Sequence, residues 1–196
     1  PDTSLEPQAS YVRAIRKAIP NDGILISGMT QIGYYSRNRY EVYEPRTFIT
    51  SSYYGNLGYE YPTALGAKVA RPDKPVVAVI GDGGFMFTIQ ELMVASELNL
   101  GLPIILWENG GLKQIQDDMR SRSIPLLGVE GANPDFIKLA ESMTCDGIEA
   151  KSVEHASDLV MDGWNKTRPT LIMVRENADY WSNNKKNSGF DSLVSR

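Results

Sequence analysis

Two short, uninterrupted apolar runs constrain the fold of this chain more than any other feature. Residues 76–80 are Val-Val-Ala-Val-Ile and residues 104–107 are Ile-Ile-Leu-Trp, with no polar residue in either run. Runs of this length and character are typical of strands that are buried on both faces. Such strands occur in parallel sheets that carry helices on both sides. The two runs therefore predict the centre of a parallel α/β sheet.

The remainder of the chain alternates helical and strand patterns around these two runs. We expect further strands near residues 24–26, 46–49, 147–150 and 171–174. We expect helices at about residues 7–18, from residue 30, and at 58–70, 85–99, 112–120, 136–142 and 153–164. The pattern predicts a doubly wound, mostly parallel α/β sheet of about six strands with helices on both faces. Residues 1–176 would form this domain, and residues 177–196 a polar C-terminal tail.

Length and charge set broad limits on function. With 196 residues, the chain has the size of one ordinary domain. The formal net charge of −4 argues against nucleic-acid binding. The sequence has no basic cluster and no long apolar stretch, so it does not predict membrane association. The single cysteine, Cys145, rules out an internal disulfide and suits the cytoplasm. Because the chain begins with Pro1 rather than methionine, we expect it to be part of a longer protein.

A cluster of glycines and oxygen-bearing residues follows each of the two central strands. The first cluster is Gly81-Asp82-Gly83-Gly84 and the second is Glu108-Asn109-Gly110-Gly111. Ligands of doubly wound sheets bind at the carboxyl ends of the strands, so we expect Asp82 and Asn109 to lie close together on one rim. Carboxylate and amide oxygens are ligands that Mg²⁺ prefers, and a helix beginning after Gly83 and Gly84 can receive a phosphate at its N-terminus. The rim therefore suits a diphosphate bridged to Mg²⁺.

Two other interpretations of the first cluster stay open from the residues alone. Gly81-Asp82-Gly83-Gly84 could be a plain turn between a strand and a helix. It could also begin a nicotinamide-dinucleotide site, because Gly81 and Gly83 follow a strand and Glu108 ends the next strand. However, Met86 stands where that fingerprint has its third glycine, and the fingerprint leaves residues 109–111 unexplained. The nicotinamide interpretation is therefore the weaker one.

The chain resembles the thiamine-diphosphate-dependent enzymes. Members of that family carry a Gly-Asp-Gly sequence, a spacer and an Asn-Asn pair, which residues 81–83 and Asn109 match. Upstream, residues 54–58 (Tyr-Gly-Asn-Leu-Gly) and 61–67 (Tyr-Pro-Thr-Ala-Leu-Gly-Ala) resemble the family's glycine-rich turn and the helix after it. The resemblance covers about residues 7–176. It implies the C-terminal, diphosphate-binding domain of such an enzyme, with thiamine diphosphate and Mg²⁺ as cofactors.

The resemblance also implies roles for particular residues. Asp82, Asn109 and the backbone carbonyl of Gly111 would bind Mg²⁺. Leu57 would be the apolar wedge that keeps the cofactor bent, and the carbonyl of Gly55 would accept a hydrogen bond from the 4′-amino group, so both would serve catalysis. The alternatives are a plain core leucine at position 57 and a simple helix start at residues 30–31. The remaining cofactor contacts would come from Thr30, Gln31, Asn56, Gly81, Gly83, Gly84, Leu112 and Ile115.

Three residues depart from the family pattern. Glu108 replaces the first Asn of the pair, Leu112 replaces an aromatic residue, and Lys113 replaces a glycine. The first Asn is not normally the metal ligand. These departures therefore bear on substrate contacts more than on cofactor binding.

The resemblance implies that this chain alone is not a complete enzyme. In the family, the glutamate that activates the cofactor comes from a pyrimidine-binding domain of the same or a neighbouring subunit, and nothing here resembles that domain. The implied assembly is a homodimer or homotetramer that decarboxylates a small 2-oxo acid or joins it to a second carbonyl compound. Residues 28–31, 42–46 and 133–136 look most like acetolactate-synthase-like proteins, especially the guanidino-oxopentanoate decarboxylases. A non-catalytic relative that uses the fold for assembly is the alternative, against which intact Asp82 and Asn109 count.

Overall fold

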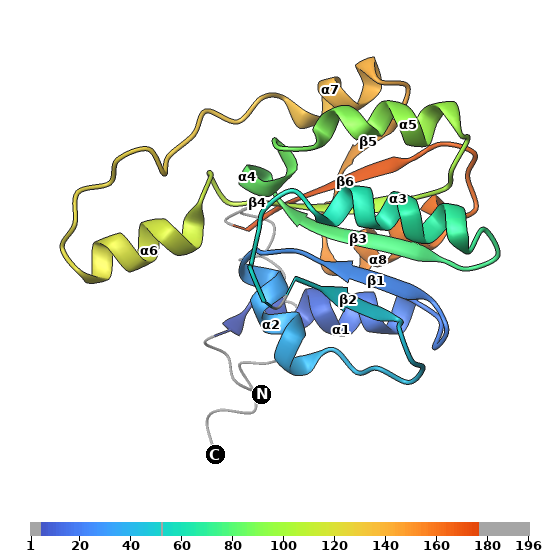
Figure 1. Cartoon of the computed structure of the whole chain (residues 1–196), viewed down its shortest axis with the longest axis horizontal. Coiled ribbons are helices and arrows are strands. Elements are labelled where there is room, and N and C mark those ends of the chain that lie inside the picture. The colour runs from blue at the N-terminus through green and yellow to red at the C-terminus, as the bar shows by residue number, and fades with distance from the viewer. Residues whose placement is uncertain (1–4, 52, 177–196) are drawn as a thin grey trace.

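The computed structural model describes residues 5–51 and 53–176, and its centre is a six-stranded sheet (Figure 1). The strand order is β2-β1-β3-β4-β6-β5, and every neighbouring pair is parallel. The two apolar runs form the adjacent strands β3 and β4 near the middle of the sheet. The predicted α/β fold is confirmed. The strands are β1 (Ile24–Ser27), β2 (Phe48–Thr50), β3 (Val76–Gly81), β4 (Pro103–Glu108), β5 (Asp146–Glu149) and β6 (Thr170–Arg175).

Helices cover both faces of the sheet. Figure 1 shows α3 (Glu60–Ala70), α5 (Leu92–Glu97) and α7 (Phe136–Ser142) on one side. The other side carries α1 (Gln8–Ala18), α2 (Gln31–Arg39) and α8 (Val153–Gly163).

Strand β3 shows why the sheet needs helices on both faces. Successive side chains of a strand point to opposite faces, so Val76, Ala78 and Ile80 pack in one hydrophobic cluster while Val77 and Val79 pack in the other. All six residues of the strand are buried. Burying one such aliphatic side chain contributes about 1.5–3 kcal/mol.

One predicted helix is wrong in form. We expected a single helix at residues 85–99, but the structure has a one-turn helix α4 (Asp82–Phe85), a 3₁₀ helix η2 (Ile89–Glu91) and then α5. The chain between them is tightened by i→i+3 hydrogen bonds, such as Thr88 N–H to the Phe85 carbonyl at 3.0 Å. Gly83 and Gly84, which are poor helix formers, make up half of the single turn of α4, and the helix does not extend beyond Phe85.

The chain reverses its direction of travel across the sheet between β1 and β3. From β1 it moves outward to β2 and then returns to place β3 on the opposite side of β1. Such a reversal leaves a crevice outside the carboxyl ends of the two strands, which is where open α/β sheets bind ligands.

Helix α6 (Lys113–Ser121) and the segment after it stand away from this body (Figure 1). The predicted tail, residues 177–196, lies outside the described residues. Within residues 5–51 and 53–176, no helix combines the length and apolar character that a membrane span requires.

Candidate functional site

A cavity of about 220 Å³ opens at the carboxyl ends of β1, β3 and β4. Every predicted site residue except Asn56 lines it. Gly55, with a positive φ of 63°, turns the chain so that Gly55 and Leu57 line the cavity. The side chain of Asn56, between them, is exposed and accepts a hydrogen bond from the Ser51 hydroxyl at 2.9 Å. The structure therefore does not place Asn56 at the cavity.

Asp82 organises the loop after β4. One of its carboxylate oxygens, Oδ2, accepts hydrogen bonds from the backbone N–H groups of Asn109, Gly110 and Gly111 at 3.3, 2.8 and 2.9 Å. The side-chain amide of Asn133 donates to the same oxygen at 2.7 Å. The side chain of Asp82 is 1% exposed. The spacing of Asp82 and Asn109 along the sequence thus places them together, as expected for neighbouring strand ends.

The Asp82 carboxylate is bound by backbone and side-chain N–H groups rather than by a cationic side chain. In the part of the chain that the structure describes, no lysine, arginine or histidine forms an ion pair with it. Its second oxygen, Oδ1, accepts a hydrogen bond from Gly83 N–H at 2.8 Å. A carboxylate oxygen has more than one lone pair, so Oδ1 retains capacity for a further donor or a cation.

The glycines at the cavity leave room that a side chain would fill. A Cβ on Gly81 would lie 2.9 Å from Thr30 Cβ, and a Cβ on Gly83 would lie 2.9 Å from Leu112 Cδ2. Gly111 has a φ of 104°, and a Cβ there would lie 2.9 Å from the Val129 carbonyl oxygen. The three strand ends can approach one another this closely because these positions have no side chain.

The helix expected to receive a phosphate after Gly83 and Gly84 is only the single turn of α4. Because a macrodipole is the sum of aligned peptide dipoles, one turn contributes little of it. Any anion at this point would therefore be bound chiefly by individual backbone N–H groups.

Glu60 is a buried acid beside the cavity that the sequence did not reveal. Its side chain is 0% exposed, and its Oε1 accepts a hydrogen bond from Met29 N–H at 3.1 Å. Its Oε2 has no hydrogen-bond partner among the described residues. Burial raises the pKa of Glu60. An acid in the first turn of a helix is ordinary, so the residue carries no signal of this environment in the sequence.

Asn133 also joins the site without a signal in the sequence. Its side-chain amide bridges two acids, Asp82 at 2.7 Å and Glu108 at 3.1 Å. Glu108, one of the departures from the family pattern, further accepts a hydrogen bond from Arg175 at 3.3 Å. The additional carboxylate is thus compensated locally by Asn133 and Arg175.

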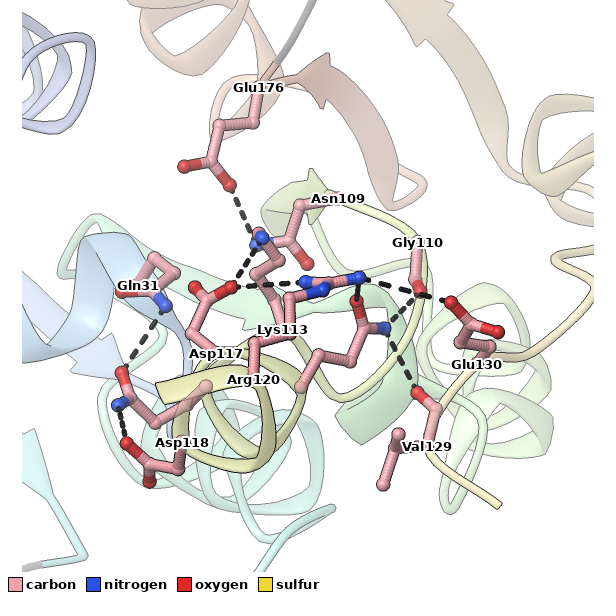
Figure 2. A network of polar contacts seen from close by, with 12 residues as sticks. Gln31, Asn109, Gly110, Lys113, Asp117, Asp118, Arg120, Val129, Glu130 and Glu176 are labelled. Atoms are coloured by element: carbon pink, nitrogen blue, oxygen red, sulfur yellow. Dashed lines mark hydrogen bonds and ion pairs between the residues drawn. The ribbon is translucent and has the colours of Figure 1, made fainter. Parts of the chain in front are cut away.

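Helix α6 is connected to the loop after β4 through Gln116, whose partners Gly110 and Val129 are labelled in Figure 2. Gln116 is 4% exposed, and its amide donates to the carbonyls of Gly110 at 2.8 Å and Val129 at 3.0 Å. The other contacts of the helix in this view are side-chain pairs, such as Gln31 with Gln114 at 3.2 Å and Lys113 with Asp117 at 2.6 Å.

The residues after β3 and β4 that line the cavity fit a hard divalent cation better than a soft one. They offer the Asp82 carboxylate, the Asn109 amide oxygen and the Gly111 carbonyl, all of them oxygen ligands. No group of three His, Cys, Asp or Glu side chains capable of holding a metal occurs in residues 5–51 and 53–176. A cation such as Mg²⁺ would therefore take its other ligands from a phosphate or water, as Mg²⁺ commonly does.

Comparison with known proteins places this geometry in a family. Residues 28–174 match the family model described as thiamine pyrophosphate enzyme, C-terminal TPP binding domain. The chain is 36% identical over 162 residues to a probable 2-ketoarginine decarboxylase, AruI, of Pseudomonas aeruginosa, covering 82% of this chain and 29% of that protein. It is 30% identical over 190 residues to the acetolactate synthase large subunit of Corynebacterium glutamicum, covering 92% of this chain and 30% of that protein.

A solved structure gives the same result. The thiamine diphosphate-dependent 4-hydroxybenzoylformate decarboxylase of Rhodococcus jostii RHA1 superposes with a TM-score of 0.79 at 25% identity. The match covers 88% of this chain and 33% of the decarboxylase chain. The present chain therefore spans about a third of the length of the proteins it resembles.

Proposed function

The chain belongs to the family of C-terminal thiamine-pyrophosphate-binding domains of thiamine-dependent enzymes, and from that premise we propose that it anchors the cofactor's diphosphate through Mg²⁺ in the cavity at the carboxyl ends of β1, β3 and β4. The observation that carries the proposal is the convergence of Asp82, Asn109 and Gly111 with Gly55 and Leu57 around one cavity. These residues come from three separate stretches of the sequence.

Asp82, the side-chain oxygen of Asn109 and the backbone carbonyl of Gly111 are the proposed metal ligands. The backbone N–H groups at Gly83 and Gly84 are the proposed donors to phosphate, because the absence of side chains lets the backbone approach the ligand. Thr30 and Gln31 would contact the diphosphate from the end of β1. Residues from the ends of β1 and β3 would thus hold the diphosphate together.

Leu57 and Gly55 would orient the rest of the cofactor. The carbonyl of Gly55 would accept a hydrogen bond from the 4′-amino group, and Leu57 would support the bent form of the cofactor from below. Leu112 and Ile115 would pack against its thiazolium ring. Leu57 and Ile115 both line the cavity. Ile115 is 45% exposed, which leaves its side chain free to pack against a bound cofactor.

The proposed activity of the whole protein is decarboxylation of a 2-oxo acid, or its addition to a second carbonyl compound. When bound, thiamine diphosphate supplies a nucleophilic carbon and an electron sink for the charge left by loss of CO₂. This chain would position the cofactor and exclude water, while the glutamate that activates the cofactor would come from a pyrimidine-binding domain. The similarity to proteins named as decarboxylases and acetolactate synthases supports this reaction class.

Exposed apolar side chains near the cavity suit such a partner domain. Tyr53 and Tyr54, directly before Gly55, are 93% and 88% exposed, and Phe87, after α4, is 63% exposed. The Tyr53 and Tyr54 rings contact each other, with centroids 5.5 Å apart, and Phe87 lies against Gly58. Large apolar side chains exposed in this way are typical of an interaction surface. We therefore propose that a pyrimidine-binding domain, of the same subunit or of a neighbour in a homodimer or homotetramer, covers this rim.

The test is a titration of thiamine diphosphate into the full chain, with Mg²⁺ and again with EDTA, followed by isothermal calorimetry. We expect saturable binding that requires Mg²⁺ and disappears in Asp82→Ala. Asp118→Ala, which removes an exposed acid from α6, is the matched control and should bind as the wild type does. Binding of NADH that is indifferent to Mg²⁺, together with no response to thiamine diphosphate when a pyrimidine-binding domain is supplied, would refute the proposal.

A further inference from the structure

The C-terminal end of β6, Arg175, and the residue after it, Glu176, contact the Glu108–Asn109 pair at the end of β4. Arg175 is the register partner of Glu108 in the parallel pairing of β4 with β6, and its guanidinium contacts the Glu108 carboxylate at 3.3 Å. The next residue, Glu176, donates its backbone N–H to the Glu108 carbonyl at 3.0 Å. Its carboxylate accepts a hydrogen bond from the Asn109 side-chain amide at 2.7 Å. Each residue of the pair therefore has its own partner at the end of β6.

The partners of Glu176 determine the orientation of the Asn109 side-chain amide. Oε2 of Glu176 also accepts the indole N–H of Trp107 at 3.1 Å, and an indole nitrogen can only donate. That oxygen is therefore an acceptor, and the Asn109 group facing it must be the NH₂. Figure 2 shows the Asn109 nitrogen toward Glu176 and the Asn109 oxygen away from it.

Glu176 itself is held in place by buried and helical partners. Trp107 is 0% exposed and packs edge-on against Tyr11 of α1, with ring centroids 5.3 Å apart. Gln8, the first residue of α1, donates to the other carboxylate oxygen at 2.6 Å. The carboxylate therefore presents a fixed acceptor to Asn109.

We propose that Glu176 is a positioning residue that fixes the Asn109 amide with its oxygen toward the cation site. The inference rests on the proposed function, in which Asn109 is a metal ligand. An asparagine amide can bind a cation only through its oxygen, and the two orientations of the group differ little in shape. An acceptor that binds the NH₂ selects the orientation that metal binding needs. Outer partners of metal ligands act in this way and are typically worth 10–100-fold in affinity.

The experiment measures binding of Mn²⁺ in place of Mg²⁺ by electron paramagnetic resonance of the free ion. The full chain is titrated with Mn²⁺ at saturating thiamine diphosphate, with its pyrimidine-binding domain supplied where this is a separate chain. Glu176→Ala should weaken Mn²⁺ binding by roughly tenfold. Glu176→Gln should bind almost as the wild type does, because its amide oxygen can accept from Asn109 and Trp107 while its NH₂ faces Gln8, whose own amide can rotate. Gln8→Ala, which leaves the acceptor of Asn109 in place, is the matched control.

A double-mutant cycle with Asn109→Asp separates orientation from stability. An aspartate has two oxygens and needs no orienting partner, and beside Glu176 it adds a repulsive like charge. We therefore expect Glu176→Ala to weaken Mn²⁺ binding when residue 109 is asparagine, and to leave it equal or tighter in the Asn109→Asp background. Equal weakening in both backgrounds, or a urea midpoint that falls in step with Mn²⁺ affinity, would overturn the inference.

The two proposals fail differently. If Asp82→Ala binds Mn²⁺ as tightly as the wild type does, the proposed metal site is refuted. If Asp82→Ala loses Mn²⁺ binding but Glu176→Ala keeps the wild-type affinity, only the role of Glu176 is refuted.

Discussion

The two sides of the cavity are held in different ways. The loops at the ends of β3 and β4 are joined by backbone N–H groups that donate to one buried carboxylate, Asp82. Helix α6, on the other side, is held by the buried Gln116 and by the backbone N–H of Leu112, which donates to the Val129 carbonyl at 3.1 Å. Its further polar contacts among the described residues are mainly side-chain pairs at its surface. Figure 1 shows the same contrast, since α6 stands apart from the layered body.

This difference indicates which part of the site is preformed. Backbone groups bound to a buried charge have few alternative geometries, and such hydrogen bonds contribute about 1.5–3 kcal/mol each. Exposed pairs contribute at most about 1 kcal/mol, because water competes for both partners. We expect the β3 and β4 loops to hold one geometry, while α6 can adjust to substrate or to a partner domain.

Asp82→Ala should have the largest effect. It removes the common acceptor of three backbone N–H groups and of the Asn133 amide, and leaves buried donors without partners. We expect a loss of about 3 kcal/mol or more in the free energy of unfolding, measured by urea denaturation, together with loss of Mg²⁺-dependent cofactor binding. The exposed Asp118→Ala variant should lose little. Equal losses in the two variants would contradict the contrast between the two sides.

Gly111→Ala should follow, with Gly110→Ala as its matched control. Both glycines have positive φ, 104° and 86°, so either alanine adds backbone strain of about 1–3 kcal/mol. At Gly111 the new Cβ would also lie 2.9 Å from the Val129 carbonyl oxygen, whereas at Gly110 nothing lies within 4 Å. Gly111→Ala should therefore lower the urea midpoint further and weaken cofactor binding more. Identical midpoints would show that the loop is less tightly packed than the structure indicates.

The pH dependence of stability should report on the buried Glu60. Burial raises the pKa of Glu60 above its ordinary value of 4.5, so the folded chain binds this proton more tightly than the unfolded chain. The free energy of unfolding should therefore fall as pH rises from about 4.5 to the raised value, by about 1.4 kcal/mol for each pH unit in that window.

Glu60→Gln removes this titration and keeps an amide oxygen for the Met29 N–H. Urea denaturation of both proteins from pH 4.5 upward should show Glu60→Gln gaining on the wild type and then running parallel to it. A constant difference across the whole range would mean that Glu60 titrates alike in the folded and unfolded chains.

The sequence predicts the strands of the preformed side but not all of the contacts that complete it. Apolar runs specify β3 and β4 because a strand buried on both faces needs apolar residues at every position, and parallel pairing then brings Asp82 and Asn109 together. It does not reveal Glu60, Asn133 or Glu176, because their roles depend on contacts between elements distant in the sequence. The break between α4 and α5 was missed for a local reason, since apolar spacing does not separate an α-helix from successive tight turns.

The smallest effect should come from the Lys113–Asp117 pair on α6. The two side chains are one turn apart, their charged atoms lie 2.6 Å apart, and both are partly exposed. Asp117 also contacts Arg120, so a double-mutant cycle of Lys113→Ala and Asp117→Ala is needed to isolate the pair. We expect a coupling energy of about 0.3–0.5 kcal/mol that declines with added salt. Gln116→Ala, on the buried face of the same helix, should cost about 1–3 kcal/mol because it removes the donor to the partly buried Gly110 carbonyl and one of the two donors to the buried Val129 carbonyl. The coupling energy of the surface pair could instead equal the stability lost in Gln116→Ala. Helix α6 would then be held as firmly as the β3 and β4 loops, and the proposed freedom of that side of the cavity would be wrong.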